Sequence, residues 1–431
     1  MVSGSVYSEL GSNLKDLHYE KFMAKGLIYN GINYQEANYN KICETPDGKI
    51  WFSGGDHNGT NRFWRTERYD LPWGFGNTTV CSYDPATDEV ELAFELDRAS
   101  AIYSNAETPG HGKIHANIVT DSKGIIYTAG YLGTSYAHDR TQLFYPKSYV
   151  GGSVFRYDPG TKVVESLGIP CPGCGIVSLY YDEKRSTVHG LDVDRCRYWR
   201  LNVDTMALKY YETNGRMNAG RDMIVDHNGC VYFPNKFNGL TRFNPDTQQF
   251  DDIDIKLPQD NFTLRGHVVT SDNVIYGITF YGMFWSYDTN NGTYKEYGNI
   301  FGDSDERTYV PSPALDESRG RIYFLGTTTH GESRQDHKKI LTIFDMKKEK
   351  FYYAGLLDIY KTCYGSMVAS DHTLYFCVST WETDKNGNYV KPPEENYENV
   401  YDPTNEKIIR PYLIKYVPPE TLDGMAEKLT R

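Results

Sequence analysis

The chain has 431 residues, of which 39% are hydrophobic and 14% aromatic, and its formal net charge is −12. This composition allows a sizeable core, and it excludes non-specific nucleic-acid binding because no basic run offsets the acidic residues. No apolar run approaches the about 18 residues that a membrane-spanning helix needs, so we expect no membrane segment.

The first twenty residues lack the charged and apolar regions of a secretory signal. We therefore expect an extracellular protein if a signal has been removed from this chain, and a cytoplasmic one otherwise.

Two short patterns then recur along the chain. One is a turn followed by a β-rich triplet that ends in an aromatic residue: DGKIW, KGIIY, NGCVY, DNVIY, RGRIY and DHTLY, which end at Trp51, Tyr127, Tyr232, Tyr276, Tyr323 and Tyr375. The other is a later strand that closes in an aromatic residue and Asp or Asn, as in VCSYDP, VFRYDP and LTRFNP. Each pattern occurs seven times if His189 fills the third aromatic position. The middle copies repeat at 42 to 44 residues, measured from Leu201 to Phe243 to Tyr287.

Four strands per repeat and seven repeats predict an all-β, seven-bladed β-propeller with four antiparallel strands per blade. We expect residues 1–431 to form this single domain, and the segment around Gly26–Tyr39 to supply the strand that closes the ring. Two stacked β-sandwiches are the alternative. The expected blades are 39–96, 113–168, 174–213, 219–256, 264–299, 309–357 and 360–422.

Polar and ionisable residues are expected to gather on one face of the propeller. If the strands of a blade are A to D from the centre outward, the B–C loops and the starts of the A strands share that face, where function usually resides. Seven of the eleven histidines map there: His57, His138, His330 and His337 in B–C loops, His111 before an A strand, and His115 and His267 at A-strand starts. The alternative is that long loops simply collect polar residues.

Three cations, Lys113, Arg221 and Arg265, open A strands. In an acidic protein such a group predicts an anion site, although pairing with nearby carboxylates such as Asp222 or Asp192 is equally open. His189 is either a core imidazole or a residue that breaks the repeat to form a site.

The eight cysteines show no disulfide framework. Cys171-Pro-Gly-Cys174 has the spacing of half a zinc site, but no second CxxC completes it. We expect no cofactor for catalysis and buried or free thiols here. A structural calcium or zinc ion stays open as the alternative.

The candidate catalytic side chains are therefore His, Tyr and Arg, since no hydrolase, metalloprotease or phosphate-loop motif occurs in a fitting context. This set suits proton abstraction beside a carboxylate. A cation neutralises the carboxylate of a uronic acid, and His or Tyr removes the C5 proton and protonates the leaving oxygen.

The run GHGKIHANIVTDSKGIIY, followed by GGSVFRYDPGT, GIVSLYYD and GRDMIVDHNGCVY, resembles the seven-bladed propeller polysaccharide lyases over residues 40–300. These are the ulvan lyases and the lyases acting on rhamnosyl-α-1,4-glucuronate, with a related propeller family of rhamnosidases. The resemblance implies His115 as one catalytic residue by motif and His138 as a second by order. It places His189 where the family has a Tyr, with Tyr180 and Tyr181 nearby. It implies Arg221 or Arg197 as the carboxylate-binding residue.

We therefore expect a carbohydrate lyase that cleaves beside a uronic acid by β-elimination, as a monomer, on an acidic oligo- or polysaccharide. The alternatives are a rhamnosidase on the same linkage and a non-catalytic carbohydrate-binding propeller. The expected catalytic residues are His115, His138, His189 and Tyr181. The expected substrate-binding residues are Arg221, Arg197, Arg265, His267, His57, Lys113 and His330.

Overall fold

The computed structural model of the chain describes most of its residues and all of its sheets. The described residues are 13–26, 28–29, 32–33, 35, 41–55, 78–101, 110–131, 149–192, 197–212, 222–258, 264–279, 281–301, 312–326, 338–359, 362–390, 401–402 and 407–428. The chain divides into two compact units. Unit 1 comprises Met1–Glu20, Thr213–Phe376 and Ile414–Arg431, and unit 2 comprises Lys21–Glu212 and Cys377–Leu413.

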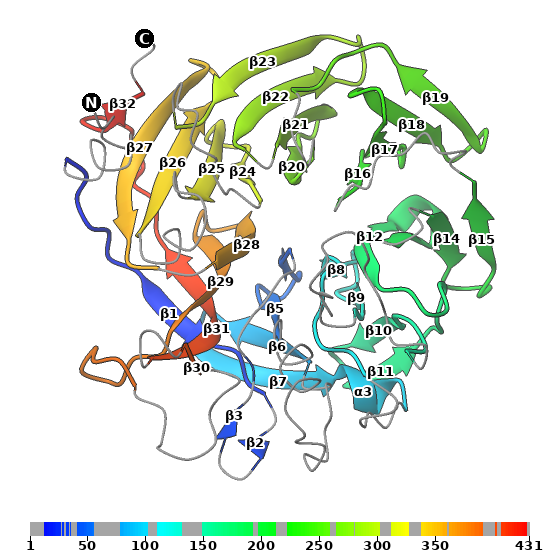
Figure 1. Cartoon of the computed structure of the whole chain (residues 1–431), viewed down its shortest axis with the longest axis horizontal. Coiled ribbons are helices and arrows are strands. Elements are labelled where there is room, and N and C mark those ends of the chain that lie inside the picture. Colours follow the sequence, from blue (N-terminus) through cyan, green and yellow to red (C-terminus); the bar gives the residue numbers. More distant parts are fainter. Residues whose placement is uncertain are drawn as a thin grey trace. The chain divides into compact units, whose positions relative to one another are not determined.

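Unit 2 contains three four-stranded antiparallel sheets, and in each the strands follow one another in chain order (Figure 1). The first sheet contains β4 (Cys43–Glu44), β5 (Ile50–Gly54), β6 (Thr79–Asp84) and β7 (Glu89–Glu95). The second contains β8 (Val119–Thr120), β9 (Ile126–Ala129), β10 (Val154–Asp158) and β11 (Val163–Ser166). The third contains β12 (Ile176–Asp182), β13 (Thr187–Asp192), β14 (Tyr198–Asn202) and β15 (Leu208–Tyr211).

Unit 1 repeats this arrangement in three more antiparallel sheets. The first contains β16 (Ile224–Val225), β17 (Val231–Pro234), β18 (Leu240–Asn244) and β19 (Gln249–Ile253). The second contains β20 (Gly266–Val269), β21 (Val274–Ile278), β22 (Met283–Asp288) and β23 (Tyr294–Asn299). The third contains β24 (Ala314–Asp316), β25 (Arg321–Gly326), β26 (Lys339–Asp345) and β27 (Lys350–Leu357), with β32 (Ala426–Glu427) on its edge.

The seventh sheet has the order β1-β31-β29-β28 and combines both ends of the chain. It contains β28 (Thr362–Val368), β29 (Leu374–Trp381), β31 (Lys407–Tyr416) and β1 (Glu20–Met23), and β30 (Tyr401–Asp402) pairs with β31. The N-terminal strand in this sheet thus precedes the expected segment 26–39. That segment instead forms a separate hairpin of β2 (Ile28–Tyr29) and β3 (Ile32–Asn33), because the two short strands pair with each other.

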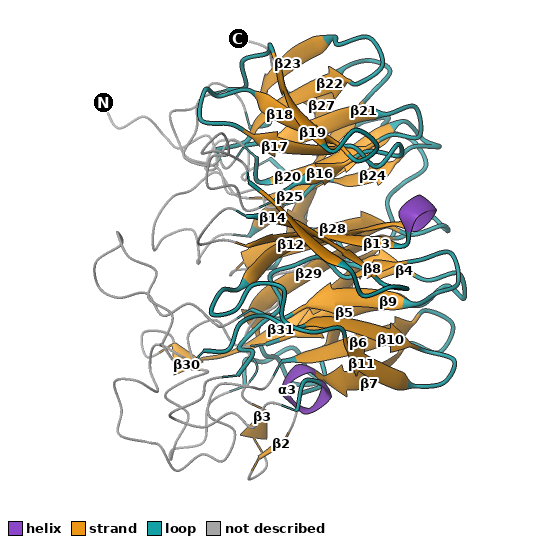
Figure 2. Cartoon of the chain, turned by 90° about the vertical axis from the view of Figure 1, so that its right-hand side faces the viewer, coloured by secondary structure: helices purple, strands orange, loops and turns teal. Residues whose placement is uncertain are grey.

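The expected fold class is confirmed: seven sheets of four antiparallel strands give a β-propeller, and helix is nearly absent from the described chain (Figure 2). The one α-helix there is α3 (Leu96–Ala99). No helix among the described residues is long and apolar enough to cross a membrane.

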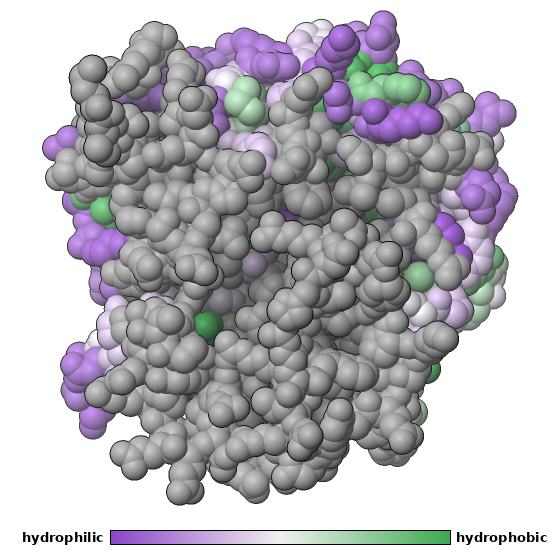
Figure 3. Space-filling view, viewed as in Figure 1, coloured by the Kyte–Doolittle hydropathy of each residue, from purple (hydrophilic) through white to green (hydrophobic). Residues whose placement is uncertain are grey.

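Burial explains the repeated sequence pattern. Second strands such as β5, β9 and β25 are buried at every position, whereas the fourth strands β11 and β19 are largely exposed. A strand covered on both faces needs apolar and aromatic side chains throughout, which is why the aromatic triplets fall in the second strands. Where described residues reach the face drawn in Figure 3, most are hydrophilic.

The turn between the first and second strands has the chemistry that the sequence indicated. Asp121 accepts hydrogen bonds from the backbone N–H groups of Lys123 and Ile125, and Gly124 adopts a φ of 83°. Asp226 and Gly229 repeat this arrangement before β17. The carboxylate closes the turn and glycine takes the left-handed conformation without strain.

Candidate functional site

A cation, an imidazole and a phenol come together just before β8 in unit 2. The backbone of Lys113 pairs with that of Tyr131 through two hydrogen bonds of 3.1 and 2.9 Å. The Lys113 ammonium lies 5.2 Å from the centre of the Tyr131 ring, and the His115 ring lies 5.4 Å from the same centre. We call Lys113, His115 and Tyr131 the His115 cluster.

The neighbouring third sheet orients this cluster. His115 Nδ1 lies 3.4 Å from the carbonyl oxygen of Val177, and Asn117 Nδ2 donates to the carbonyl of Leu179 at 3.0 Å. His115 and Asn117 therefore both contact backbone carbonyls of β12, in the segment that leads into β8. A carbonyl beside Nδ1 favours the tautomer with its proton on Nδ1, which leaves Nε2 as the acceptor.

A glycine makes room for the phenol of the cluster. A Cβ atom on Gly175 would lie 2.5 Å from Cδ2 of Tyr131, so any other residue there would displace the ring. Tyr131 and Lys113 are 3% and 2% exposed, whereas His115 is half-buried. A second lysine lies close by, since Lys41 Nζ donates to the Tyr180 hydroxyl at 2.7 Å.

His189 is part of the core. It is 0% exposed, its Nδ1 lies 2.5 Å from the Tyr198 hydroxyl, and its Nε2 lies 3.7 Å from Asp182. Burial lowers the pKa of its imidazole, so the neutral form is favoured. Burial disfavours the ionised Asp182, but hydrogen bonds from His189 and Arg185 outweigh that effect and lower the pKa of Asp182 to about 2. Both ring nitrogens of His189 lie beside side chains of its own sheet, Tyr198 and Asp182, so its role is in the core of that sheet.

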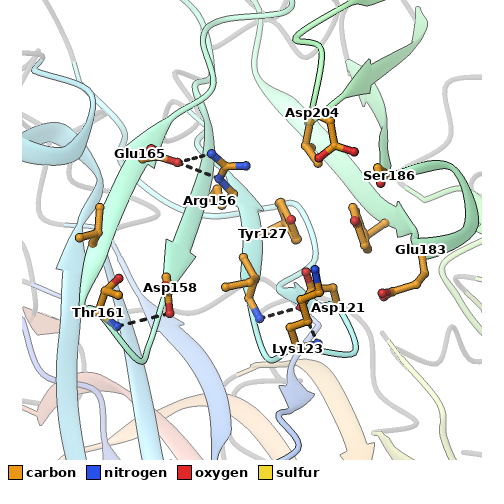
Figure 4. A pocket seen from close by; sticks show the side chains of 14 residues that line it. Asp121, Lys123, Tyr127, Arg156, Asp158, Thr161, Glu165, Glu183, Ser186 and Asp204 are labelled. Carbon is orange, nitrogen blue, oxygen red and sulfur yellow. Dashed lines mark hydrogen bonds and ion pairs between the residues drawn. The ribbon is translucent and has the colours of Figure 1, made fainter.

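Tyr181 lies at the far end of β12 from the His115 cluster. Its ring stacks on Tyr127 with a centroid distance of 4.5 Å, four residues beyond Val177 or about 13 Å along a strand. Both rings line a pocket of about 500 Å³ between the second and third sheets (Figure 4). Polar groups in this pocket bond to one another: Arg156 pairs with Glu165, and the Asp158 carboxylate accepts the backbone N–H of Gly160. We assign this pocket no chemistry.

Arg197 also belongs to unit 2 and pairs with a buried carboxylate. Its Nε lies 2.9 Å from Asp192, and its guanidinium reaches the Cys174 sulfur at 4.0 Å. Cys171 and Cys174 are both buried, and no described group of three or more His, Cys, Asp or Glu residues is arranged to hold a metal. Arg197, expected to bind the substrate carboxylate, thus already pairs with Asp192.

Arg265 and His267 lie at the start of β20 in unit 1. His267 Nδ1 lies 3.0 Å from Asp222 Oδ2, and the Arg265 guanidinium lies 5.8 Å from the ring centre of Tyr364. The remaining expected residues, His57, His138, Arg221 and His330, lie outside the described residues.

Sequence reasoning overlooked Tyr131 and the pairing of Asp222 with His267. Tyr131 ends the segment IIYTAGY, four residues after the repeated aromatic residue Tyr127. This second tyrosine, just beyond a predicted strand, was the available signal. The sequence suggested Asp222 only as a partner for cations such as Arg221. Its observed partner, His267, lies in another sheet, and sequence patterns do not report such a contact.

No protein-family model and no curated protein matches the chain. Streptogramin B lyase has a similar structure, with a TM-score of 0.53 and 12% identity over 83% of this chain and 95% of that one. A catalytically inactive histidine-to-alanine variant of virginiamycin B lyase from Staphylococcus aureus with quinupristin gives a TM-score of 0.54 and 10% identity, covering 84% and 96%. The WD40 repeats of RRP9 give 0.54 and 8%, covering 93% and 100%. At these identities the similarity shows that the chain has the β-propeller fold.

Proposed function

We propose that this protein is a carbohydrate lyase that cleaves the glycosidic bond to a uronic acid, such as a rhamnosyl-glucuronate, by β-elimination. The observation that carries the proposal is the His115 cluster, which holds a cation, an imidazole and a phenol within one site. The resemblance of the surrounding motif to propeller polysaccharide lyases supports it. A structural neighbour of the same fold is a lyase whose histidine-to-alanine variant is inactive.

Each member of the cluster has one role in the reaction. Lys113 pairs with the uronate carboxylate and makes the C5 proton more acidic, since it neutralises charge that would oppose carbanion formation. His115 Nε2 takes that proton. The C4–O bond then breaks as the C4–C5 double bond forms, and the Tyr131 hydroxyl donates its proton to the departing oxygen.

Turnover of a rhamnosyl-glucuronate oligosaccharide tests the proposal. A lyase product contains a conjugated double bond and absorbs in the ultraviolet, whereas a hydrolase product does not. We expect His115→Ala and Tyr131→Phe each to lower kcat by about 10²-fold or more, the usual effect of losing a general acid or base. His227→Ala should leave kcat unchanged, because His227 is an exposed turn residue of unit 1.

Two results would contradict the lyase activity itself. Cleavage without ultraviolet absorbance would identify a hydrolase, and tight binding without cleavage would identify a carbohydrate-binding propeller. Near-normal turnover by a folded His115→Ala variant would remove the His115 cluster from the mechanism.

A further inference from the structure

Unit 1 contains an acid–base pair that the His115 cluster does not use. Asp222 precedes β16 and His267 lies in β20, and their side chains are only 7% and 4% exposed. Oδ2 of Asp222 lies 3.0 Å from His267 Nδ1, while its Oδ1 accepts the backbone N–H of Met223 at 3.0 Å. The backbone hydrogen bond orients the carboxylate, and the 3.0 Å contact is close enough for an ion pair once His267 is protonated.

A buried cation accompanies the pair. Arg265 stands immediately before β20 and two residues before His267, so a chain that stays extended there would place the two side chains on the same side. Arg265 is 8% exposed, its backbone N–H donates to Ile278 at 2.8 Å, and its guanidinium lies over the Tyr364 ring of β28. A guanidinium keeps its charge when buried and offers two parallel donors, the geometry that a carboxylate accepts. Low local polarity strengthens that attraction.

The other Asp–His pairs among the described residues serve the fold. His111 bonds Asp97 through Nδ1 and accepts the backbone N–H of Ser153 at Nε2, so both ring nitrogens hold loops in place. His189 is enclosed in the third sheet. His372 bonds Asp316 at 3.0 Å in a turn at the opposite end of its sheet from the first-strand starts. The Asp222–His267 pair differs because a buried arginine, Arg265, stands two residues before His267 in the chain.

We propose that Asp222, Arg265 and His267 form an anion site in unit 1 that binds the carboxylate of an acidic sugar. Arg265 binds the carboxylate, and His267 takes up a proton when the anion arrives. Asp222 acts as a positioning residue that stabilises the resulting imidazolium. The choice of a uronate as ligand rests on the proposed function; the site itself rests on the three side chains. Among the described residues, Asp222 before β16 contacts His267, and Arg265, which precedes β20, lies over the Tyr364 ring of β28.

Calorimetric titration with glucuronate, in HEPES and in Tris at one neutral pH, tests this inference. Proton uptake makes the measured enthalpy depend on the buffer, whereas binding without uptake does not. We expect Arg265→Gln to weaken binding about tenfold or more, as the loss of hydrogen bonds to a charged group would. His267→Gln should abolish the buffer dependence, and Asp222→Asn should reduce it while glucuronate still binds. His372→Asn, in the matched Asp–His pair, should change neither quantity.

The same variants separate this inference from the proposed function. Unchanged affinity and buffer dependence in folded Arg265→Gln and His267→Gln would show that the pair only joins two sheets, and would overturn the inference. Loss of glucuronate binding in Lys113→Met but not in Arg265→Gln would assign the carboxylate to the His115 cluster, overturning the inference and leaving the proposed function in place. Arg265-dependent binding in a protein without lyase turnover would support the inference and contradict the proposed function.

Discussion

Glu95, at the end of β7, carries a carboxyl group that its surroundings favour in the protonated form. It is 7% exposed, and burial raises its pKa from 4.5 to about 7, although Arg98 at 3.0 Å opposes the shift. A carboxyl group with a higher pKa in the folded than in the unfolded state stabilises the fold most below the unfolded value. That contribution is lost as the pH rises from 4.5 through 7.

We therefore expect Glu95→Gln to flatten the fall in unfolding free energy between pH 5 and 8, measured by urea denaturation at several pH values. Glu91→Gln is the control, because a hydrogen bond from Lys162 lowers the pKa of Glu91 and keeps it ionised throughout that range. If the unfolding free energy of Glu95→Gln fell with pH as steeply as that of the wild type, Arg98 would already compensate the buried charge of Glu95.

Single residues of the candidate site were only partly predictable from the sequence. Lys113 and His115 stand in one short motif, so their shared position before a strand followed from local pattern. The phenol of Tyr131 and the pairing of Asp222 with His267 depend on backbone pairing and on contact between sheets. Such contacts join residues distant in the sequence, which strand periodicity does not report.

Among the elements, β13 depends on a glycine that lies under a tryptophan. Gly190 pairs with Trp199 of β14, and a Cβ atom there would lie 1.9 Å from Cζ2 of the buried indole. The same arrangement joins Gly277 and Trp285 in β21 and β22. The small residue on one strand therefore makes space for the large one on the next.

Gly190→Ala should lower the free energy of unfolding by about 1–3 kcal/mol, because the added methyl group forces a packed ring to move. Urea denaturation followed by circular dichroism measures the loss. In a Trp199→Leu background the same change should have a smaller effect, and Gly160→Ala, whose added atom would meet only Asp158 at 3.3 Å, serves as the control. Equal losses in both backgrounds would show that the indole is not what Gly190 accommodates.

At the scale of elements, strand positions were more predictable than edges. The six aromatic residues of the recurring triplets all lie in second strands. They were predictable because the turn residues and the apolar residues that a doubly covered strand needs are neighbours in the sequence. The N-terminal partner of the seventh sheet was placed too late in the chain, at 26–39 instead of Glu20–Met23. β32 was not expected, since a two-residue edge strand has no pattern of its own.

For the whole molecule, seven copies of one strand-and-turn pattern identified the propeller because each copy independently specifies the same sheet. The ligand is less directly specified, since an acidic protein and an acidic sugar repel one another at long range. Because the protein has a net charge of −12, the salt concentration should affect how fast the proposed substrate reaches its site.

This repulsion leads to a prediction for the salt dependence of turnover. Added salt screens charges separated by more than about 10 Å at 0.1 M but affects buried groups much less. Lys113 is 2% exposed, so its attraction for the carboxylate should persist while the long-range repulsion weakens. We expect kcat/KM for a uronate oligosaccharide to rise by roughly two- to tenfold as salt increases from about 10 to 150 mM. The methyl ester of the same oligosaccharide, which carries no charge, should show little change. A steep fall for the free acid would instead mean that exposed cations guide the substrate, and that the buried cluster is not where its charge is first recognised.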